Sequence, residues 1–255
     1  QVHSIHNENL EGKTVRWRNI NIQTVDLEKS MKTVNVDVPE ISYLDNQLTD
    51  NEVRTGWRFL WDGKSTAGWR GAKMDDFPDN GWEIKDGMLT VLSSEGTESA
   101  NGGDIVTTDL FGDFELSVDF KITEGANSGI KYFVDSELNK GEGSAIGLEF
   151  QVLDDQKHPD AKMGKNGNRT VGSLYDLIRA ENTNNSRGKN FKEVGKWNNA
   201  RIVVKDGHVE HWLNQVKVVE FDRFSQMFKA LVEKSKYEKW ENFGRLSQGL
   251  ILLQD

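Results

Sequence analysis

The feature that most constrains the fold of this chain is a succession of short segments in which apolar and polar residues alternate. Alternation with a period of two places one set of side chains on each face of a β-strand. Tight turns between such runs are indicated by Asp86-Gly87, Asp206-Gly207 and Asn214-Gln215. The pattern predicts an all-β fold, an antiparallel sandwich rather than a parallel α/β sheet. The predicted strands are 14–22, 82–91, 114–122, 128–135, 147–153, 198–221 and 249–254.

One stretch departs from this alternation. Asp222 can cap the start of a helix and Gly244 can end it. We therefore expect one amphipathic helix at about 222–243, lying against the sandwich. Residues 23–56 have only weak periodicity and are expected to form a connecting arm. The apolar residues that recur at helical spacing are Phe224, Met227, Phe228, Leu231 and Val232.

Charge and composition limit the classes of molecule that this chain can bind. The chain carries a net charge of -9, which disfavours nucleic acid and anionic lipid because both bind basic surfaces. It has no cysteine, so disulfides, thiolate metal sites and cysteine nucleophiles are excluded. No apolar run reaches the roughly 20 residues that span a bilayer, and no membrane insertion is expected. An uncharged or weakly charged small molecule fits this surface best.

The segment 147–161, GLEFQVLDDQKHPDA, holds the strongest candidates for a functional site. Its strand directs alternate side chains to one face, and loops carried by a rigid sheet are where functional residues concentrate. A second interpretation is that the loop is a turn held by side-chain to backbone hydrogen bonds. The candidates are Glu149 and Gln151 in the strand, followed by Asp154, His158 and Asp160 in the loop.

Several motifs, in order along the chain, together resemble a known family. They are FLWDGKSTAGWRG (59–71), DFELSVDFKITEGANSGIKYFV (113–134), GLEFQVLDDQKHPDA, GSLYDLI (172–178) and GLILLQD (249–255). They are similar to the 3-keto-disaccharide hydrolase domain family. The resemblance implies a concanavalin-like jelly roll and the cleavage of glycosides already oxidised to a ketone at sugar C3. It also implies a bacterial protein of carbohydrate metabolism that is secreted, periplasmic or on the cell surface, with its targeting segment absent from this chain.

The position of the closing strand along the sequence differs from that in the family. Family domains usually continue after the LQD motif with a His-Gly turn and a closing strand, whereas this sequence stops at Asp255. The segment GKTVRWRNINI (12–22) resembles that strand. We expect one domain over 1–255 in circularly permuted order, with the two chain ends close together. The alternative is that residues 1–22 are the tail of a preceding domain.

The substrate class that the resemblance implies has an acidic proton at C2, beside the ketone. A general base removes this proton to form an enolate, the substituent at C1 leaves by elimination, and water adds back to complete a net hydrolysis. We expect Glu149 and His158 to be the catalytic acid/base residues. The enolate oxygen needs positive charge nearby, for which we expect a divalent metal, Ca²⁺, Mg²⁺ or Mn²⁺, on Asp154 and Asp160.

Four further residues are expected to contact the sugar: Gln151, Asn127, Tyr175 and Trp212. Asn127 and Tyr175 fall on motifs of the family, NSG and GSLYDLI. Their structural alternatives are a turn cap for Asn127 and a core aromatic ring for Tyr175. His211 and Trp212 are adjacent in a strand, so the two cannot both point at one ligand.

The main hypothesis is therefore an enzyme, a glycoside hydrolase or lyase that acts on 3-keto-glycosides, with a small carbohydrate as its partner. The first alternative is a non-catalytic carbohydrate-binding sandwich that has the fold without the reaction. The second is a hydrolase of unoxidised glycans, which needs two carboxylates about 5–10 Å apart. The oligomeric state stays open.

Overall fold

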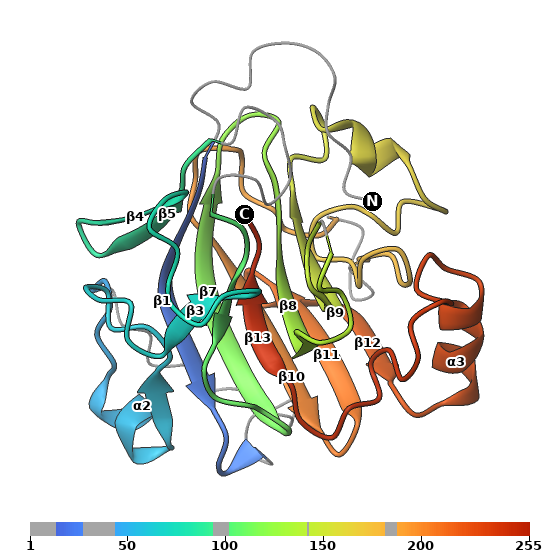
Figure 1. Ribbon diagram of the computed structural model, residues 1–255, viewed down its shortest axis with the longest axis horizontal. Helices are drawn as coiled ribbons and strands as arrows, with labels where there is room; N and C mark the ends of the chain where they lie inside the picture. Colours follow the sequence, from blue (N-terminus) through green and yellow to red (C-terminus); the bar gives the residue numbers. More distant parts are fainter. Residues whose placement is uncertain (1–13, 28–43, 94–101, 142, 182–187) are drawn as a thin grey trace.

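Two antiparallel β-sheets pack face to face in the computed structural model, which describes residues 14–27, 44–93, 102–141, 143–181 and 188–255 (Figure 1). The larger sheet has the strand order β12-β11-β10-β7-β1-β5-β4, and β2 pairs with β1 beside this path. The smaller sheet has the order β3-β6-β13-β8-β9. The all-β sandwich expected from the sequence is confirmed, and its jelly-roll connectivity stays a prediction.

The elements have the following bounds. The larger sheet contains β1 (Val15–Gln23), β2 (Trp57–Phe59), β4 (Trp82–Lys85), β5 (Met88–Val91), β7 (Phe114–Ile122), β10 (Asn198–Lys205), β11 (His208–Leu213) and β12 (Val216–Asp222). The smaller sheet contains β3 (Trp69–Gly71), β6 (Ile105–Thr107), β8 (Asn127–Asp135), β9 (Ile146–Leu153) and β13 (Leu250–Leu253). The helical elements are α2 (Asp50–Arg54), α3 (Gln226–Glu233) and the 3₁₀ turn η1 (Pro159–Lys162). Neither α-helix in the described ranges is long and apolar enough to cross a bilayer.

One apolar core fills the space between the sheets. Trp17 and Phe120 of the larger sheet meet there with a ring separation of 6.3 Å, and Phe150 and Ile251 of the smaller sheet are fully buried. Leu252 follows Ile251 in β13 and points to the opposite face of the smaller sheet, because side chains alternate along a strand. There it belongs to a second apolar cluster, which includes the loop residues Ala72 and Ala145. This outer face also carries the candidate site.

The three predicted tight turns are present. Asp86 and Gly87 join β4 to β5, Asp206 and Gly207 join β10 to β11, and Asn214 and Gln215 join β11 to β12. Each pair has two positive φ angles, for example 48° and 68° at Asn214 and Gln215. Two positive φ angles are the signature of the type I′ turn, whose twist matches that of paired strands. Local sequence therefore determined these hairpins.

The first described strand, β1, lies inside the larger sheet. It pairs antiparallel with β7 on one side and with β5 on the other. A bulge between Arg18 and Asn21 interrupts the pairing with β7, and Asn19 has a positive φ of 50° at this point. The segment expected to supply a closing strand thus forms a strand between two others. The distance between the chain ends lies outside the described residues because Gln1 does, and the permuted order stays a prediction.

The amphipathic helix is shorter than predicted. Helix α3 begins after Ser225, whose hydroxyl accepts the Phe228 N–H, and it ends at Glu233, with Lys234 as its C-cap. The strand β12 extends through Asp222, which therefore cannot cap the helix. After the helix the chain forms turns, in which the rings of Tyr237 and Phe243 stack 4.1 Å apart. This ring pair is buried in the core, in the part of the predicted helix that the chain forms as turns.

One histidine is part of the core. His211, on β11, is fully buried beside Phe150. Its Nδ1 donates to the Gly172 carbonyl at 3.1 Å because a carbonyl can only accept, and its Nε2 then accepts the Tyr132 hydroxyl at 2.8 Å. Burial lowers the pKa of His211 from 6.5 to about 4. The imidazole is therefore neutral in the folded protein at neutral pH.

This histidine makes stability depend on pH. In the unfolded chain it gains a proton near pH 6.5, but in the fold only near pH 4. The unfolded state therefore binds more protons in this window, and the free energy of unfolding should fall by about 3 kcal/mol as the pH drops from 7 to 4. Urea unfolding at both pH values should show this loss in wild type and His208→Gln. His211→Gln should lack it; an unchanged loss in this variant would contradict the assignment.

Candidate active site

The strand β9 directs Glu149 and Gln151 onto the outer face of the smaller sheet. Its intervening residues Leu148, Phe150 and Val152 point into the core, as the alternation predicts. Antiparallel pairing with β8 places Lys131 directly opposite Glu149 and Gly129 opposite Gln151. A rigid two-stranded platform thus carries an acidic and a basic group side by side.

Glu149 lies across β8, in the space left by a glycine. A Cβ atom on Gly129 would stand 2.4 Å from Glu149 Oε1. The other carboxylate oxygen is 3.9 Å from the Lys131 ammonium, and the Glu149 residue is only 5% exposed. The carboxylate is therefore nearly removed from water, in a position that a larger residue at 129 would not allow.

The edge of β9 receives an extra segment, residues 172–178. The Tyr175 N–H donates to the Glu149 carbonyl at 3.0 Å, and the Gln151 N–H donates to the Ser173 carbonyl at 3.1 Å. This pairing brings the Tyr175 ring beside the Glu149 side chain. Burial raises the pKa of Tyr175, and the negative charges of Glu149 and Asp160 raise it further. Tyr175 therefore stays a neutral hydroxyl.

The turns after α3 bring two more residues to this place. The Lys236 ammonium lies 4.2 Å from the centre of the Tyr175 ring and 5.2 Å from that of the Tyr237 ring. Burial lowers the pKa of Lys236, and burial with the charge of Glu149 raises that of Tyr237. We call Lys131, Glu149, Tyr175, Lys236 and Tyr237 the Glu149 cluster. The sequence indicated neither Lys236 nor Tyr237.

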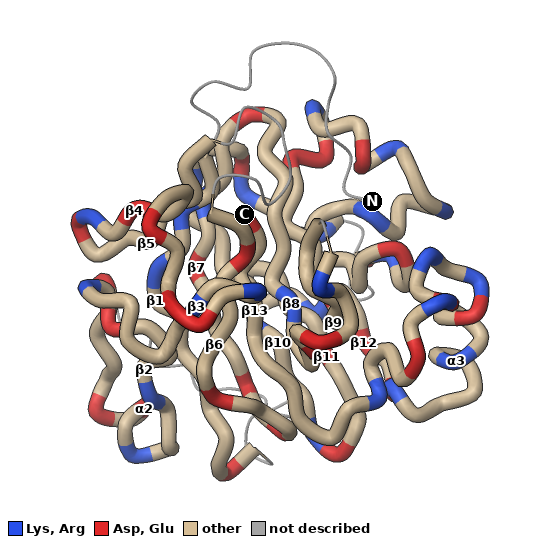
Figure 2. The backbone as a smooth tube through the Cα atoms, in the orientation of Figure 1, with Lys and Arg blue, Asp and Glu red and all other residues tan. Residues whose placement is uncertain are grey.

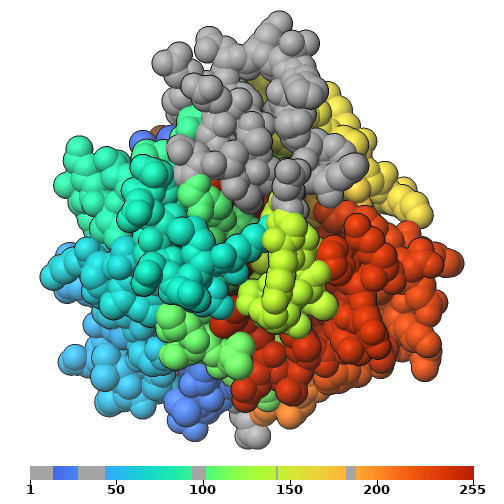
Figure 3. All heavy atoms as spheres, viewed as in Figure 1, coloured from blue at the N-terminus to red at the C-terminus, as the bar shows by residue number. Residues whose placement is uncertain are grey.

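Groups of both charges lie in the segments around the cluster (Figure 2). In the view of Figure 3 the chain after β8 lies against the chain after α3. Acidic and basic positions follow one another along the loops near α3 (Figure 2). Glu149 is thus buried among charged and aromatic groups rather than in hydrocarbon.

His158 and Asp160 join this site through Tyr175. The His158 Nδ1 accepts the Asp160 N–H at 3.2 Å and so caps η1. Asp160 accepts the Tyr175 hydroxyl at 2.8 Å and pairs with Arg169 at 2.8 Å. Arg169 also binds Asp176 at 2.7 Å. One connected region therefore contains four of the predicted residues, Glu149, His158, Asp160 and Tyr175. In it His158 contacts Asp160, and Asp160 contacts Tyr175.

The two aspartates predicted to bind a metal do not form a shared donor set. Asp154 accepts the N–H of Gly125 at 2.7 Å with one oxygen, and those of Gln156 and Lys157 with the other. Asp160 is occupied by Tyr175 and a guanidinium. This arrangement of Asp154 is that of the capped turn, the second interpretation of the loop. The metal on these residues stays a prediction, and no chemical step below runs through it.

Gln151 and Asn127 form a polar pair beside the cluster. The Gln151 Nε2 donates to Asn127 Oδ1 at 3.0 Å across the two strands. Gln151 is 1% exposed, and among the described residues its Oε1 has no hydrogen-bond partner. A buried acceptor without a donor is costly, and a ligand hydroxyl or a water would satisfy it.

The structure does not bring Trp212 to this site. It lies on β11 of the larger sheet, on the face opposite His211, with its ring between the side chains of Arg201 and Lys217. Trp212 therefore lies on a different sheet from the other predicted sugar contacts, since alternation gives the face of a strand but not its sheet, and a sugar contact by Trp212 stays a prediction. Nearby, His208, Glu210 and Glu220 offer atoms within 4.8 Å of one another, but Lys217 pairs with both carboxylates.

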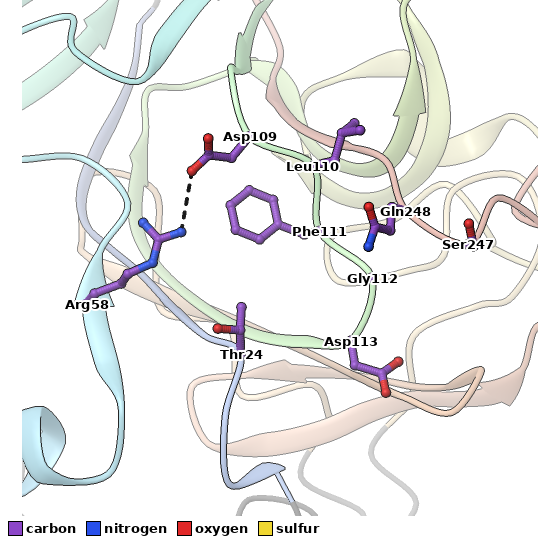
Figure 4. Close-up of a pocket in the computed structure, with 9 residues that line it drawn as sticks. All are labelled: Thr24, Arg58, Asp109, Leu110, Phe111, Gly112, Asp113, Ser247 and Gln248. Carbon is purple, nitrogen blue, oxygen red and sulfur yellow. Dashed lines mark ion pairs between the residues drawn. The ribbon is translucent and has the colours of Figure 1, made fainter.

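A separate hollow opens at the ends of the strands (Figure 4). Arg58 and Asp109 pair across it at 3.6 Å, and the guanidinium lies 5.7 Å from the Phe111 ring. No residue predicted from the sequence to be functional lines it. The lining residues are Thr24, Arg58, Asp109, Leu110, Phe111, Gly112, Asp113, Ser247 and Gln248.

Comparisons with known proteins agree with this architecture. The family model of the 3-keto-alpha-glucoside-1,2-lyase-like domain matches residues 56–255. A curated relative from Bacteroides thetaiotaomicron, named 3-keto-disaccharide hydrolase, is 36% identical over 197 residues, which is 72% of this chain and 66% of the relative. This chain thus spans slightly less than two thirds of that relative's length.

Two solved structures from Parabacteroides distasonis ATCC 8503 are similar, and both are described as a "putative glycosyl hydrolase". One has a TM-score of 0.67 and 28% identity, over 82% of this chain and 92% of its own. The other has a TM-score of 0.50 and 25% identity, over 73% and 90%.

The buried network around Asp160 should contribute strongly to stability. Asp160→Asn keeps the shape of the side chain but removes the charge that faces Arg169, at an expected cost of about 2 to 3 kcal/mol in the free energy of unfolding. The control is Asp155→Asn in the same loop, where the more exposed pair with Lys189 predicts about 1 kcal/mol. Urea unfolding at neutral pH measures both. Equal, small losses would contradict the proposed importance of the network.

Proposed function

The chain belongs to the 3-keto-alpha-glucoside-1,2-lyase-like domain family, and from this premise we propose that it is a carbohydrate hydrolase that cleaves 3-keto-glycosides with Glu149 as its general base. The observation that carries the proposal is the position of Glu149. A nearly buried carboxylate lies beside two lysines and two tyrosines, on a rigid sheet face. Such an environment suits a base that removes a proton from carbon.

The relatives support the same class of substrate. One bears the name of a 3-keto-disaccharide hydrolase, and the two solved structures bear that of a glycosyl hydrolase. Our proposal extends these names to this chain, because the Glu149 cluster lies within the matched residues 56–255. The substrate is then a small carbohydrate.

The proposed reaction begins with the proton at C2. The Glu149 carboxylate takes this proton, and the electrons of the C2–H bond form a C2–C3 double bond while the C3 oxygen becomes an enolate. The enolate collapses to the ketone, a C1–C2 double bond forms, and the C1–O bond breaks. The departing oxygen takes the proton that Glu149 holds. One carboxyl group thus serves first as base and then as acid.

Addition of water reverses these steps. Glu149 takes a proton from water as the hydroxide adds to C1, and it then returns this proton to C2. The sum is cleavage of one glycosidic bond by one water molecule. Because the same residue handles each proton, this scheme does not need a second carboxylate at the distance that conventional glycosidases require.

The other predicted residues support this base. The Tyr175 hydroxyl donates its proton to Asp160. Tyr175 therefore contributes its ring, and not a proton, to the contacts with Lys236. His158 caps the turn that carries Asp160, and we assign it a positioning role in place of a catalytic one. The unpartnered Oε1 of Gln151 would accept a hydrogen bond from a sugar hydroxyl.

Replacement of the base gives the first test of this function. With a chromogenic aryl 3-keto-glucoside, Glu149→Gln should lower kcat/KM by about 10² to 10⁴, the usual contribution of a general base. Glu210→Gln is a matched control, because Glu210 is 4% exposed but lies on the other sheet, and it should keep wild-type activity. Saturable binding by wild type without turnover would contradict catalysis and support a carbohydrate-binding module.

Chelation tests the metal prediction in the same assay. Asp154 and Asp160 bind groups of the chain itself, so a rate that EDTA leaves unchanged would contradict a metal on these two residues. Loss of activity that Mn²⁺ restores would instead assign a metal to the reaction.

The glycine beneath the carboxylate gives a second test. Gly129→Ala places a methyl group 2.4 Å from the present position of Glu149 Oε1, so the carboxylate must move. We expect kcat/KM to fall at least about tenfold with the fold retained, because small displacements of a catalytic group are costly. In the control Gly141→Ala the nearest atom is 3.7 Å away, and activity should not change. Full activity of Gly129→Ala would contradict the assigned position of the base.

A further inference from the structure

We propose that the Lys236 ammonium binds the C3 oxygen of the substrate and stabilises the negative charge that forms there. This inference rests on the function proposed above and adds a second catalytic residue to it. The enolate carries most of its negative charge on the C3 oxygen, and a positioned cation is an effective way to stabilise such a charge.

The first support is that the donors of Lys236 are unused. Among the described residues no oxygen accepts a hydrogen bond from this ammonium, although its backbone N–H donates to Asp176 Oδ2 at 3.3 Å. The backbone is therefore anchored, while the ammonium makes no hydrogen bond or ion pair with the part of the chain that the structure describes. A partly buried ammonium without an acceptor is unfavourable unless something else occupies its donors.

The second support comes from comparison with the other lysine of the cluster. The Lys131 ammonium contacts the Ser144 hydroxyl, donates to the Ala145 carbonyl at 3.2 Å and faces Glu149. Ser144 in turn contacts Asp104. Lys131 is thus held within the protein by its own partners. Lys236 is the lysine of this cluster whose donors remain for a ligand.

The third support is that aromatic rings fix the place of the ammonium. The ring centres of Tyr175 and Tyr237 lie 4.2 and 5.2 Å from Lys236 Nζ. Rings attract a cation without consuming its N–H donors, so they can hold it ready for an oxygen. Tyr237 is itself fixed by stacking on Phe243.

Burial is the largest influence on the pKa of Lys236, and charges of both signs surround it. Glu149 and Asp176 favour its protonated form, whereas burial, Lys131 and Arg169 disfavour it and lower its pKa. A more acidic ammonium donates a stronger hydrogen bond to an enolate oxygen. The pKa values of Tyr175 and Tyr237 are raised, so neither tyrosine accounts for a loss of activity below pH 10.

Substitution of Lys236 tests the inference. Lys236→Met removes the charge at similar length and should lower kcat/KM for an aryl 3-keto-glucoside by about 10² to 10³, the usual loss for one oxyanion donor. Lys236→Arg should retain much more activity. The matched control is Lys239→Met, an exposed lysine on the same segment that lies 5.0 Å from the Trp240 ring; it should behave as wild type.

The pH profile separates a catalytic from a structural role. In wild type kcat/KM should fall at alkaline pH, below the ordinary lysine pKa of about 10.4, as Lys236 loses its proton. In Lys236→Arg this fall should move to higher pH, because a guanidinium stays charged. A wild-type profile in Lys236→Arg, or wild-type activity in Lys236→Met, would overturn the inference.

Binding to an inactive protein distinguishes this failure from that of the proposed function. Glu149→Gln should bind the 3-keto-glucoside more tightly than the glucoside, and Lys236→Met in that background should lose the preference. If wild type cleaves the 3-keto-glucoside but the double variant keeps the preference, Lys236 does not bind the ketone and only the further inference fails. If wild type does not cleave it, the proposed function fails, and the inference that rests on it fails with it.

Discussion

The pairing of β8 with β9 is the constraint on which the candidate site depends. Its register places Lys131 opposite Glu149 and Gly129 beneath the carboxylate. A slip of one residue would turn every side chain of β9 to the other face and bury Glu149 in the core. The apolar residues on the inner face prevent such a slip, because Leu148, Phe150 and Val152 are fully buried. Core packing thus positions a charged group that does not belong to the core.

Three distant parts of the chain complete the site around this platform. The 172–178 segment pairs with the edge of β9 and delivers Tyr175. The turns after α3 deliver Lys236 and Tyr237, and the 3₁₀ turn η1 delivers Asp160. These segments are held by backbone pairing, by ring stacking and, for Asp160, by the His158 cap and the pair with Arg169, so the side chains are ordered before a substrate arrives. Preorganised charge of this kind is the main means by which enzymes stabilise an anionic transition state.

Much of the fold could be predicted from the sequence because it is local. Alternation gave the long strands and the outward face of Glu149, and Asp-Gly and Asn-Gln pairs gave the hairpins. The strands β2, β3 and β6 were missed, since three residues are too few to show a period. Lys236 was assigned to a helix that in fact ends at Glu233. Its neighbours come from β8, β9 and the 172–178 segment, and no single stretch of sequence contains that information.

The central claim is that Glu149 removes the proton at C2, and isotope exchange tests it most directly. When a 3-keto-glycoside is cleaved in D₂O, early product should carry one deuterium at C2, beyond that of the product sugar incubated alone; NMR measures this at each carbon. The account predicts incorporation by wild type and its loss, together with cleavage, in Glu149→Gln. Product that keeps protium at C2 while wild type cleaves the bond would contradict the account, because the reaction would then proceed without an enolate.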